Sequence, residues 1–125
     1  FMDLDGFKPI NDRYGHAMGD AVLQAVAGRI NSCVRQEDFA ARIGGDEFVV
    51  VLQDIEQADA VTAMAQRIRS SLAQSLMIDG QQIRVGASIG MASYPADGTT
   101  ADALLARADQ MMYDIKRDSK TASAA

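Results

Sequence analysis

A glycine pair followed by two carboxylates is the feature that most constrains this fold. Residues 44–47 read Gly-Gly-Asp-Glu and lie between two short apolar runs, residues 39–43 and 48–52. Runs of this length and composition are typical of buried strands, and adjacent glycines supply the positive φ angles that a tight hairpin turn needs. The sequence therefore predicts a β-hairpin whose tip carries up to two negative charges, Asp46 and Glu47.

A second pair of carboxylates lies near the start of the chain. Asp3 and Asp5 alternate with Met2 and Leu4, so both carboxylates are expected on one face of a strand. Taken alone, such a pair is more often a solvated strand end than a binding site. Beside the charged hairpin tip, however, it is typical of a site that holds a hard cation through carboxylate oxygens.

The charge and composition of the chain exclude some classes of function. Its 125 residues, 48% of them hydrophobic, are enough for one domain with its own core. Twelve basic and seventeen acidic residues give a net charge of −5, so we expect no basic surface for nucleic acid. An anionic ligand would need a metal ion to offset the repulsion.

The cysteine content, the apolar runs and the first residues bear on the cellular compartment and on where the domain begins. The single Cys33 excludes an internal disulfide and is expected to be a buried apolar residue. No apolar run approaches the roughly 18 residues of a membrane span, and no secretory leader is visible, so we expect a cytoplasmic domain without direct membrane contact. Phe1-Met2 is typical of a strand already under way, which predicts a single domain over residues 1–125 with an incomplete first strand.

Apolar periodicity predicts the order of helices and strands. After the first strand we expect a short helix to Tyr14-Gly15, a helix from Gly19-Asp20, the hairpin, a helix over residues 54–72, a small hairpin at Asp79-Gly80, a strand over residues 83–91 and a helix over residues 101–118. The strand over residues 83–91 has one thin face of glycine and serine, which would allow close approach of a helix or ligand. This order indicates an α+β fold with an antiparallel-rich central sheet flanked by helices, ferredoxin-like or like the palms of nucleotide cyclases and polymerases.

Several short blocks of the sequence have the spacing of one known family. They are Asp3-Leu4-Asp5-Gly6-Phe7-Lys8, Asn11-Asp12, Tyr14-Gly15-His16, Gly19-Asp20, residues 42–48, Ser88-Ile89-Gly90, and Ala108-Asp109 with Tyr113 and Lys116. Each block alone is a weak signal, but together they cover nearly the whole chain. On these blocks the chain resembles the GGDEF domain of the diguanylate cyclase family, which implies condensation of two GTP molecules into cyclic di-GMP and pyrophosphate.

The resemblance implies roles for the acidic cluster and a nearby lysine. Two Mg²⁺ or Mn²⁺ ions per active site would be held by Asp3, the backbone carbonyl of Leu4, Asp46 and Glu47. The catalytic residues would be Asp46, Glu47 and Lys8, the last by stabilising phosphate charge in the transition state.

The resemblance also implies a pocket for GTP. Asn11 and Asp20 would bond the guanine edge, and Leu23 would pack on the base. His16 would belong to the same pocket, although a histidine taken alone is more often a capping or core residue. The bare backbone at Gly44-Gly45 would leave room for phosphates.

Two lysines near the end of the chain complete the substrate-binding residues. Lys116 and Lys120 would contact phosphate groups. Ser119-Lys120 stands where family members usually carry Gly-Arg, so a bidentate phosphate clamp becomes a point charge.

Arg35 and Asp38 stand three residues apart, so both could project from one side of a last helical turn. An Arg-x-x-Asp pair by itself is close to noise. The resemblance implies an inhibitory site in which Arg35 pairs with a phosphate and a guanine of the product. The implied partners are therefore GTP, cyclic di-GMP and a second GGDEF domain that completes a catalytic homodimer.

Two other readings remain open at the level of sequence. A catalytically inactive GGDEF module could bind GTP or cyclic di-GMP as a sensor, although such modules tend to lose the carboxylates that are intact here as Asp3, Asp46 and Glu47. A plain interaction domain would leave the acidic cluster unexplained.

Overall fold

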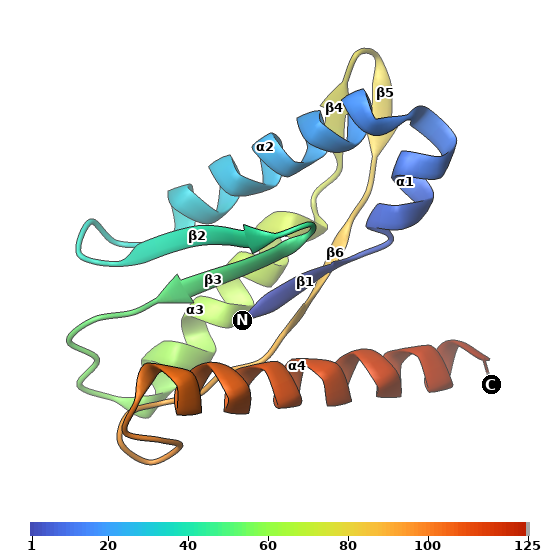
Figure 1. The fold of residues 1–125 in the computed structure, drawn as a ribbon. Helices are drawn as coiled ribbons and strands as arrows, with labels where there is room; N and C mark the ends of the chain where they lie inside the picture. Colours follow the sequence, from blue (N-terminus) through green and yellow to red (C-terminus); the bar gives the residue numbers. More distant parts are fainter. Residues whose placement is uncertain (125) are drawn as a thin grey trace.

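A computed structural model describes residues 1–124, except the side chains of Ala58 and of residues 119–124. The elements are β1 (Met2–Asp5), α1 (Phe7–Tyr14), α2 (His16–Cys33), β2 (Phe39–Gly44), β3 (Glu47–Val51), α3 (Ala58–Ala73), β4 (Leu76–Ile78), β5 (Gln81–Ile83), β6 (Gly86–Ile89) and α4 (Ala101–Ala124) (Figure 1). Within the described part of the chain, no helix is both long and apolar enough to cross a membrane.

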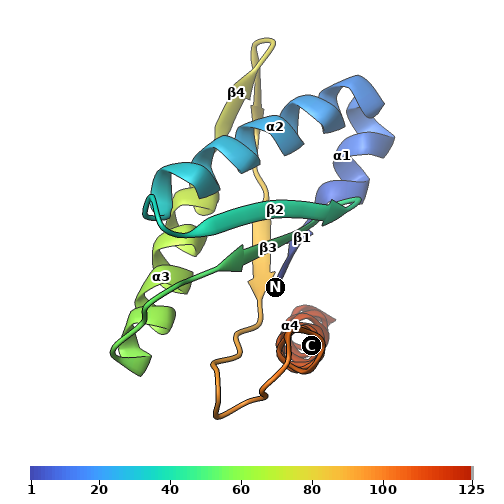
Figure 2. The ribbon, with the colours of Figure 1, turned by 60° about the vertical axis from the view of Figure 1, so that its left-hand side comes forward.

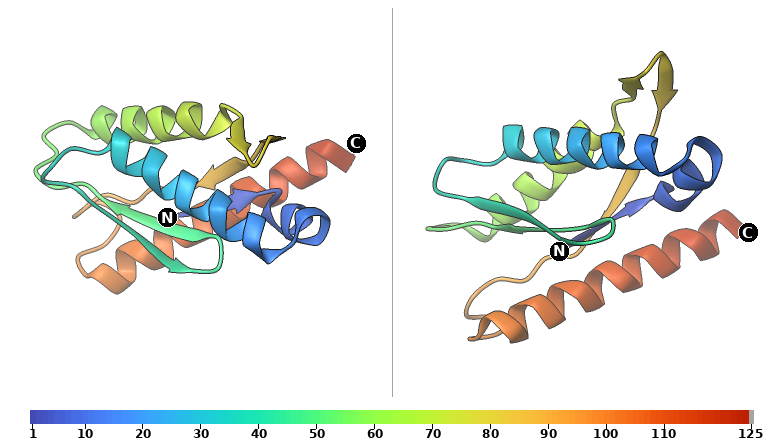
Figure 3. Two further views of the ribbon diagram at one scale, coloured as in Figure 1. Left: turned by 90° about the horizontal axis from the view of Figure 1, so that it is seen from above. Right: turned by 45° about the horizontal axis from the view of Figure 1, so that its top comes forward.

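A four-stranded sheet forms the centre of the molecule. Its strand order is β2-β3-β1-β6, and each neighbouring pair is antiparallel. Helices α2 and α3 lie on one side of this sheet, whereas α4 lies on the other side against β6 and β1 (Figures 2 and 3). The predicted α+β fold with an antiparallel central sheet flanked by helices is therefore confirmed.

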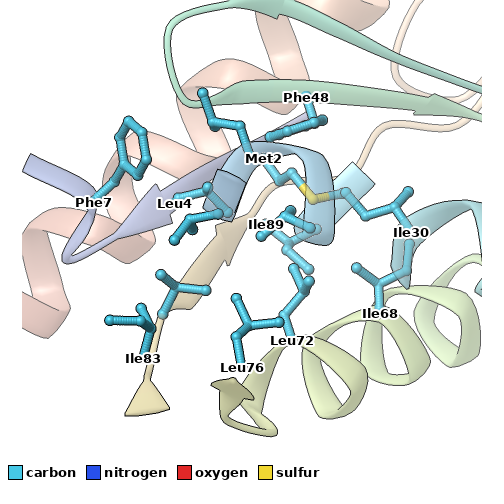
Figure 4. Close-up of a cluster of buried hydrophobic side chains, with 14 of the residues drawn as sticks. Met2, Leu4, Phe7, Ile30, Phe48, Ile68, Leu72, Leu76, Ile83 and Ile89 are labelled. Atoms are coloured by element: carbon cyan, nitrogen blue, oxygen red, sulfur yellow. The ribbon is translucent and has the colours of Figure 1, made fainter. Parts of the chain in front are cut away.

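The hydrophobic core lies between the sheet and the α2–α3 layer. Met2 and Leu4 point into it from β1 and are each 1% exposed, because alternation along the strand sends the neighbouring aspartates to the other face. Phe48 and Ile89 add to the core from the flanking strands, and α2 and α3 contribute apolar side chains such as Ile30, Ile68 and Leu72 (Figure 4). The sulfur of Cys33 is buried there too, as expected.

Two helices begin at other residues than predicted. Helix α2 begins at His16, not near Gly19-Asp20, because Gly15 has a φ of 90°, ends α1 and leads directly into the next helix. Helix α3 begins at Ala58, not at Asp54, since Asp54 has a φ of 54° that a right-handed helix does not allow.

The predicted hairpin forms, but its strands are less buried than expected. The turn residues are Gly45-Asp46, and of the glycine pair only Gly45 has a positive φ, 34°. Phe39 is 60% exposed, Ile43 52% and Val51 47%. Because α2 packs on the inner side of this half of the sheet and α4 lies over β6 and β1 instead, the outer face of the hairpin is open.

The predicted strand over residues 83–91 is interrupted after Ile83. Among the described residues, strand β5 pairs with β4 alone, through a turn in which Asp79 and Gly80 both have positive φ angles, so the small hairpin is confirmed. Strand β6 pairs with β1. At Gly90 the expected close approach of a helix is present, since a Cβ atom there would lie 1.9 Å from the carbonyl oxygen of Ala108 in α4.

Candidate active site

The central strand β1 places the two acidic segments side by side. Asp3 lies opposite Glu47 of β3 and opposite Ser88 of β6, so these three side chains leave the same face of the sheet. The amide of Leu4 donates a hydrogen bond of 3.1 Å to the carbonyl oxygen of Asp46, which ties the hairpin turn to β1. The structure thus brings Asp3, Asp46 and Glu47 to one end of the sheet.

Lys116 of α4 extends toward the same face of the sheet. Its Nζ atom lies 2.9 Å from Asp3 Oδ2 and 3.5 Å from Asp5 Oδ1. Burial alone would lower the pKa of Lys116, but the hydrogen bond to Asp3 and the charges of Asp3, Asp5 and Asp46 outweigh this and raise the pKa. The ammonium group therefore stays charged at neutral pH.

Asp3 and Asp46 form a carboxyl pair with an unsatisfied oxygen. Burial comes first among the causes that raise the pKa of Asp46, followed by the neighbouring Asp3 carboxylate, which favours a proton on Asp46 and repels a negative charge there. Asp3 Oδ1 is buried and has no hydrogen-bond partner among the described residues. Leaving such an oxygen unpaired is costly, and a bound cation would remove the cost.

The donors at this site fit a hard divalent cation. Carboxylate and carbonyl oxygens are the ligands that Mg²⁺ prefers. No group of three or more acidic, histidine or cysteine side chains converges on one point among the described residues. Protein sites for Mg²⁺ often supply only one or two carboxylates and leave the remaining positions to phosphates and water, so the Asp3–Asp46 pair is sufficient.

Asp5 and Ser88 belong to this site; the sequence interpretation placed Asp5 with Asp3 at a possible cation site and assigned no role to Ser88. The Ser88 hydroxyl lies 3.0 Å from Asp5 Oδ1 and 3.1 Å from Oδ2. Ser88 is 3% exposed. Two sequence signals were available. The alternation of β1 places Asp5 on the same face as Asp3, and Ser88 is a polar residue on the thin face of the predicted strand over residues 83–91.

The predicted GTP-binding residues from the first part of the chain lie on two helices, α1 and α2. Lys8 on α1 is exposed, as are His16 and Asp20 on α2. The side chain of Asn11 packs against α2 so closely that a Cβ atom on Gly19 would meet Asn11 Oδ1 at 1.8 Å. The remaining residue, Leu23, is buried in the core cluster on α2. No contact in the structure tests their predicted roles toward a base.

The glycine pair of the hairpin has free space around it. Cβ atoms placed on Gly44 or Gly45 would have no other atom within 4 Å. Lys120 was predicted to contact phosphate, but its side chain lies outside the described residues, as does that of Ser119.

Arg35 and Asp38 are paired, but in a turn after α2 and not in its last helical turn as predicted. Helix α2 ends at Cys33, and the amide of Asp38 donates to the Arg35 carbonyl oxygen at 3.0 Å. Arg35 Nε and Nη2 donate to the two carboxylate oxygens of Asp38, each at 3.0 Å. These bonds lower the pKa of Asp38, and a further bond joins Arg35 Nη2 to the carbonyl oxygen of Gln53 at 2.6 Å.

The fold and the site define a class: α+β domains in which a lysine of a covering helix reaches an acidic pair on one face of the central sheet. Within that class, the sequence model for "Diguanylate cyclase, GGDEF domain" matches residues 1–122. The chain belongs to the GGDEF domain family.

Two curated relatives show how the chain compares with longer proteins. It is 48% identical over 116 residues to the bifunctional diguanylate cyclase/cyclic di-GMP phosphodiesterase MucR of Pseudomonas aeruginosa, covering 93% of this chain and 17% of that protein. It is also 48% identical over 120 residues to diguanylate cyclase A of Treponema denticola, covering 95% of this chain and 32% of that protein. The chain thus spans about a sixth to a third of these relatives.

Solved structures agree with the fold. The GGDEF domain of TpbB (YfiN) from Pseudomonas aeruginosa has a TM-score of 0.89 at 44% identity, with 94% of this chain and 73% of that chain covered. The GGDEF domain of DgcB from Caulobacter crescentus, in complex with c-di-GMP, has a TM-score of 0.83 at 31% identity, with 94% and 70% covered.

Proposed function

We propose that the protein is a diguanylate cyclase that condenses two GTP molecules into cyclic di-GMP and releases two pyrophosphates. The observation that carries the proposal is the half-buried Asp3–Asp46 carboxyl pair, in which the buried Asp3 Oδ1 has no partner among the described residues and lies beside the charged Lys116. Family membership supports the same reaction class, since several relatives are named diguanylate cyclases.

Each residue of the site has a task in that reaction. Two Mg²⁺ or Mn²⁺ ions, held by Asp3, the Leu4 carbonyl, Asp46 and Glu47, would activate the attacking 3′-hydroxyl and offset phosphate charge. Asp46, whose pKa is raised by burial and by Asp3, is suited to accept the proton of the hydroxyl. Lys116 and Lys8 supply positive charge to the α-phosphate as it is attacked and to the leaving pyrophosphate.

Base recognition is assigned to the junction of α1 and α2. Asp20 is exposed there and can accept hydrogen bonds from the guanine N1–H and amino group, while the Asn11 amide lies against the neighbouring Gly19. Each domain holds one GTP, so the reaction needs a second copy whose site faces the first.

A product site at Arg35 and Asp38 fits the same activity. Asp38 holds the guanidinium in a fixed orientation through two bonds, Glu37 Oε1 lies 3.3 Å from Arg35 Nε, and among the described residues the Nη1 group has no hydrogen-bond partner. That free edge suits a phosphate or guanine oxygen. The solved DgcB complex supports product binding by a relative of this fold.

A sensor that binds nucleotide without catalysis is less well supported. Such a module would not need an acidic pair beside an ammonium group, nor a raised pKa at Asp46, and this chain has both.

An assay with GTP and Mg²⁺ tests the proposal. The unmodified protein should form cyclic di-GMP, and Asp46→Asn, which keeps the shape of the side chain, should lower kcat by at least about a hundredfold. The matched control is Asp59→Asn, which removes an equal charge from an exposed position in the first turn of α3. Equal activity of Asp46→Asn and the control would remove Asp46 from the mechanism.

A further inference from the structure

The lysine of the site has two carboxylate partners, and the proposed reaction would weaken its bond to the nearer one. In the free chain, Lys116 Nζ is bonded to Asp3 Oδ2 at 2.9 Å. If Asp3 holds a divalent cation through its unpaired Oδ1 atom, the cation repels the ammonium group on Oδ2 and weakens this bond, because two positive charges then share one carboxylate.

Asp5 offers the ammonium group a second position without removing it from the site. Asp5 lies two residues along β1 on the same face, about 7 Å farther along the strand by ordinary strand geometry. Its Oδ1 atom is already 3.5 Å from Lys116 Nζ. A small displacement along the sheet therefore moves the lysine from Asp3 to Asp5.

Ser88 fixes the Asp5 carboxylate in the orientation that this requires. Its hydroxyl lies 3.0 and 3.1 Å from the two oxygens of Asp5. Ser88 is the one polar residue that is buried among the described residues, whereas the Asp5 side chain is 44% exposed. An exposed carboxylate would otherwise rotate freely, so the buried hydroxyl restricts it.

We infer that Asp5 and Ser88 are positioning residues for Lys116. The inference rests on the proposed function. Asp5 receives the ammonium group when Asp3 binds a cation and keeps it within reach of the substrate phosphates, and Ser88 holds Asp5 in place. Neither residue is required to touch the nucleotide.

A double-mutant cycle between Asp5 and Lys116 tests the inference. The variants are Asp5→Asn, Lys116→Met and the two together, in the natural full-length protein, with Asp59→Asn as the matched charge control. The probe is 3′-deoxy-GTP with Mg²⁺ in calorimetry, because this nucleotide lacks the attacking hydroxyl and cannot be consumed. Cyclic di-GMP formation from GTP and thermal unfolding of each variant are measured beside it.

The expected result is coupling between the two residues. Asp5→Asn should weaken 3′-deoxy-GTP binding about three- to fivefold in the unmodified background, the upper range for a partly exposed ion pair. In the Lys116→Met background, Asp5→Asn should have no effect or should strengthen binding slightly, since the change then removes only the repulsion between Asp5 and the phosphates. Ser88→Ala should weaken binding to a smaller extent, and only when Asp5 is present.

Two outcomes would overturn the inference, and they differ from failure of the proposed function. If Asp5→Asn changes the affinity by the same factor in both backgrounds, or not at all, while the unmodified protein binds and turns over normally, Asp5 does not position Lys116. If the unmodified protein neither binds the probe nor forms product, the proposed function fails and this inference fails with it.

Discussion

At the scale of single residues, the unpaired Oδ1 atom of Asp3 is the main reason to interpret the acidic pair as a cation site. Asp3 Oδ1 is buried without a partner in the part of the chain that the structure describes, and it adjoins Asp46, whose pKa burial and Asp3 raise. The gathering of Asp3 and Asp46 could be predicted from sequence, because alternation and a tight turn fix where both side chains leave the sheet. The Ser88–Asp5 bond could not, since it depends on the register of two strands 83 residues apart.

The raised pKa of Asp46 predicts that removing its charge stabilises the folded protein, even though the same change should lower its activity. A carboxyl group with a raised pKa contributes most to stability below its ordinary value of 3.8 and loses that contribution as the pH rises through the raised value. Asp46→Asn should therefore stabilise the nucleotide-free protein at pH 7, by roughly 0.5 kcal/mol after solvent screening. Thermal unfolding at pH 7 and pH 3.5 measures this, and a larger gain at the lower pH would contradict the assigned cause.

Asp20 carries a prediction about base choice. Because adenine lacks the paired donors of the guanine N1–H and amino group, GTP should be preferred over ATP by more than about a hundredfold. Asp20→Ala should reduce the use of GTP by roughly ten- to a hundredfold, the worth of hydrogen bonds to a charged group. A competition assay with both nucleotides tests this prediction. Equal use of ATP and GTP by the unmodified protein would refute it.

At the scale of elements, the placement of α4 decides where the lysine of the site lies. A Cβ atom on Gly90 would lie 1.9 Å from the carbonyl oxygen of Ala108 and 2.5 Å from the amide of Met112, both in the α4 backbone. This contact sets how closely α4 approaches the end of β6. The distance between Lys116 and Asp3 therefore depends on Gly90, although no hydrogen bond among the described residues joins Gly90 to either of them.

A glycine pair tests this packing. Gly90→Ala should destabilise the protein by about 3 kcal/mol and weaken the Lys116–Asp3 bond, because the clash is with backbone that cannot rotate away. Gly28→Ala is the control: Gly28 lies inside α2 with nothing within 4 Å of an added Cβ atom, so the change should stabilise by about 0.5–1 kcal/mol. Chemical denaturation of both variants measures the two effects, and a neutral Gly90→Ala would contradict the described packing.

The turn between α2 and β2 carries the prediction about regulation. If the Arg35 Nη1 edge binds product, Arg35→Ala should weaken cyclic di-GMP binding roughly ten- to a hundredfold and relieve product inhibition. Arg69→Ala is the control, because Arg69 also pairs locally with a side chain three residues away, Gln66, but on α3. Unchanged product affinity of Arg35→Ala in calorimetry would mean that the Arg35–Asp38 pair only stabilises the turn.

At the scale of the whole molecule, the order of elements and a sheet flanked by helices followed from sequence, but the part of the sheet that α4 covers did not. The apolar periodicity of the sequence and its turn residues identify the strands, both hairpins and the helices, because these signals are local. The exposure of Phe39 and Val51 was mispredicted, since an apolar strand does not reveal which half of the sheet α4 will cover. The start of α3 was missed because Asp54 has a positive φ and Gln57 is extended, and apolar periodicity carries no signal for either conformation.

Product analysis after incubation with GTP and Mg²⁺ tests the central claim most directly. Separation by mass should show cyclic di-GMP and pyrophosphate in a ratio of one to two, with two GTP consumed for each cyclic product. The rate per protein molecule should rise with protein concentration, because two domains must meet. Pyrophosphate without cyclic di-GMP, or GTP left intact by a protein that is folded and binds 3′-deoxy-GTP, would contradict the assignment as a cyclase.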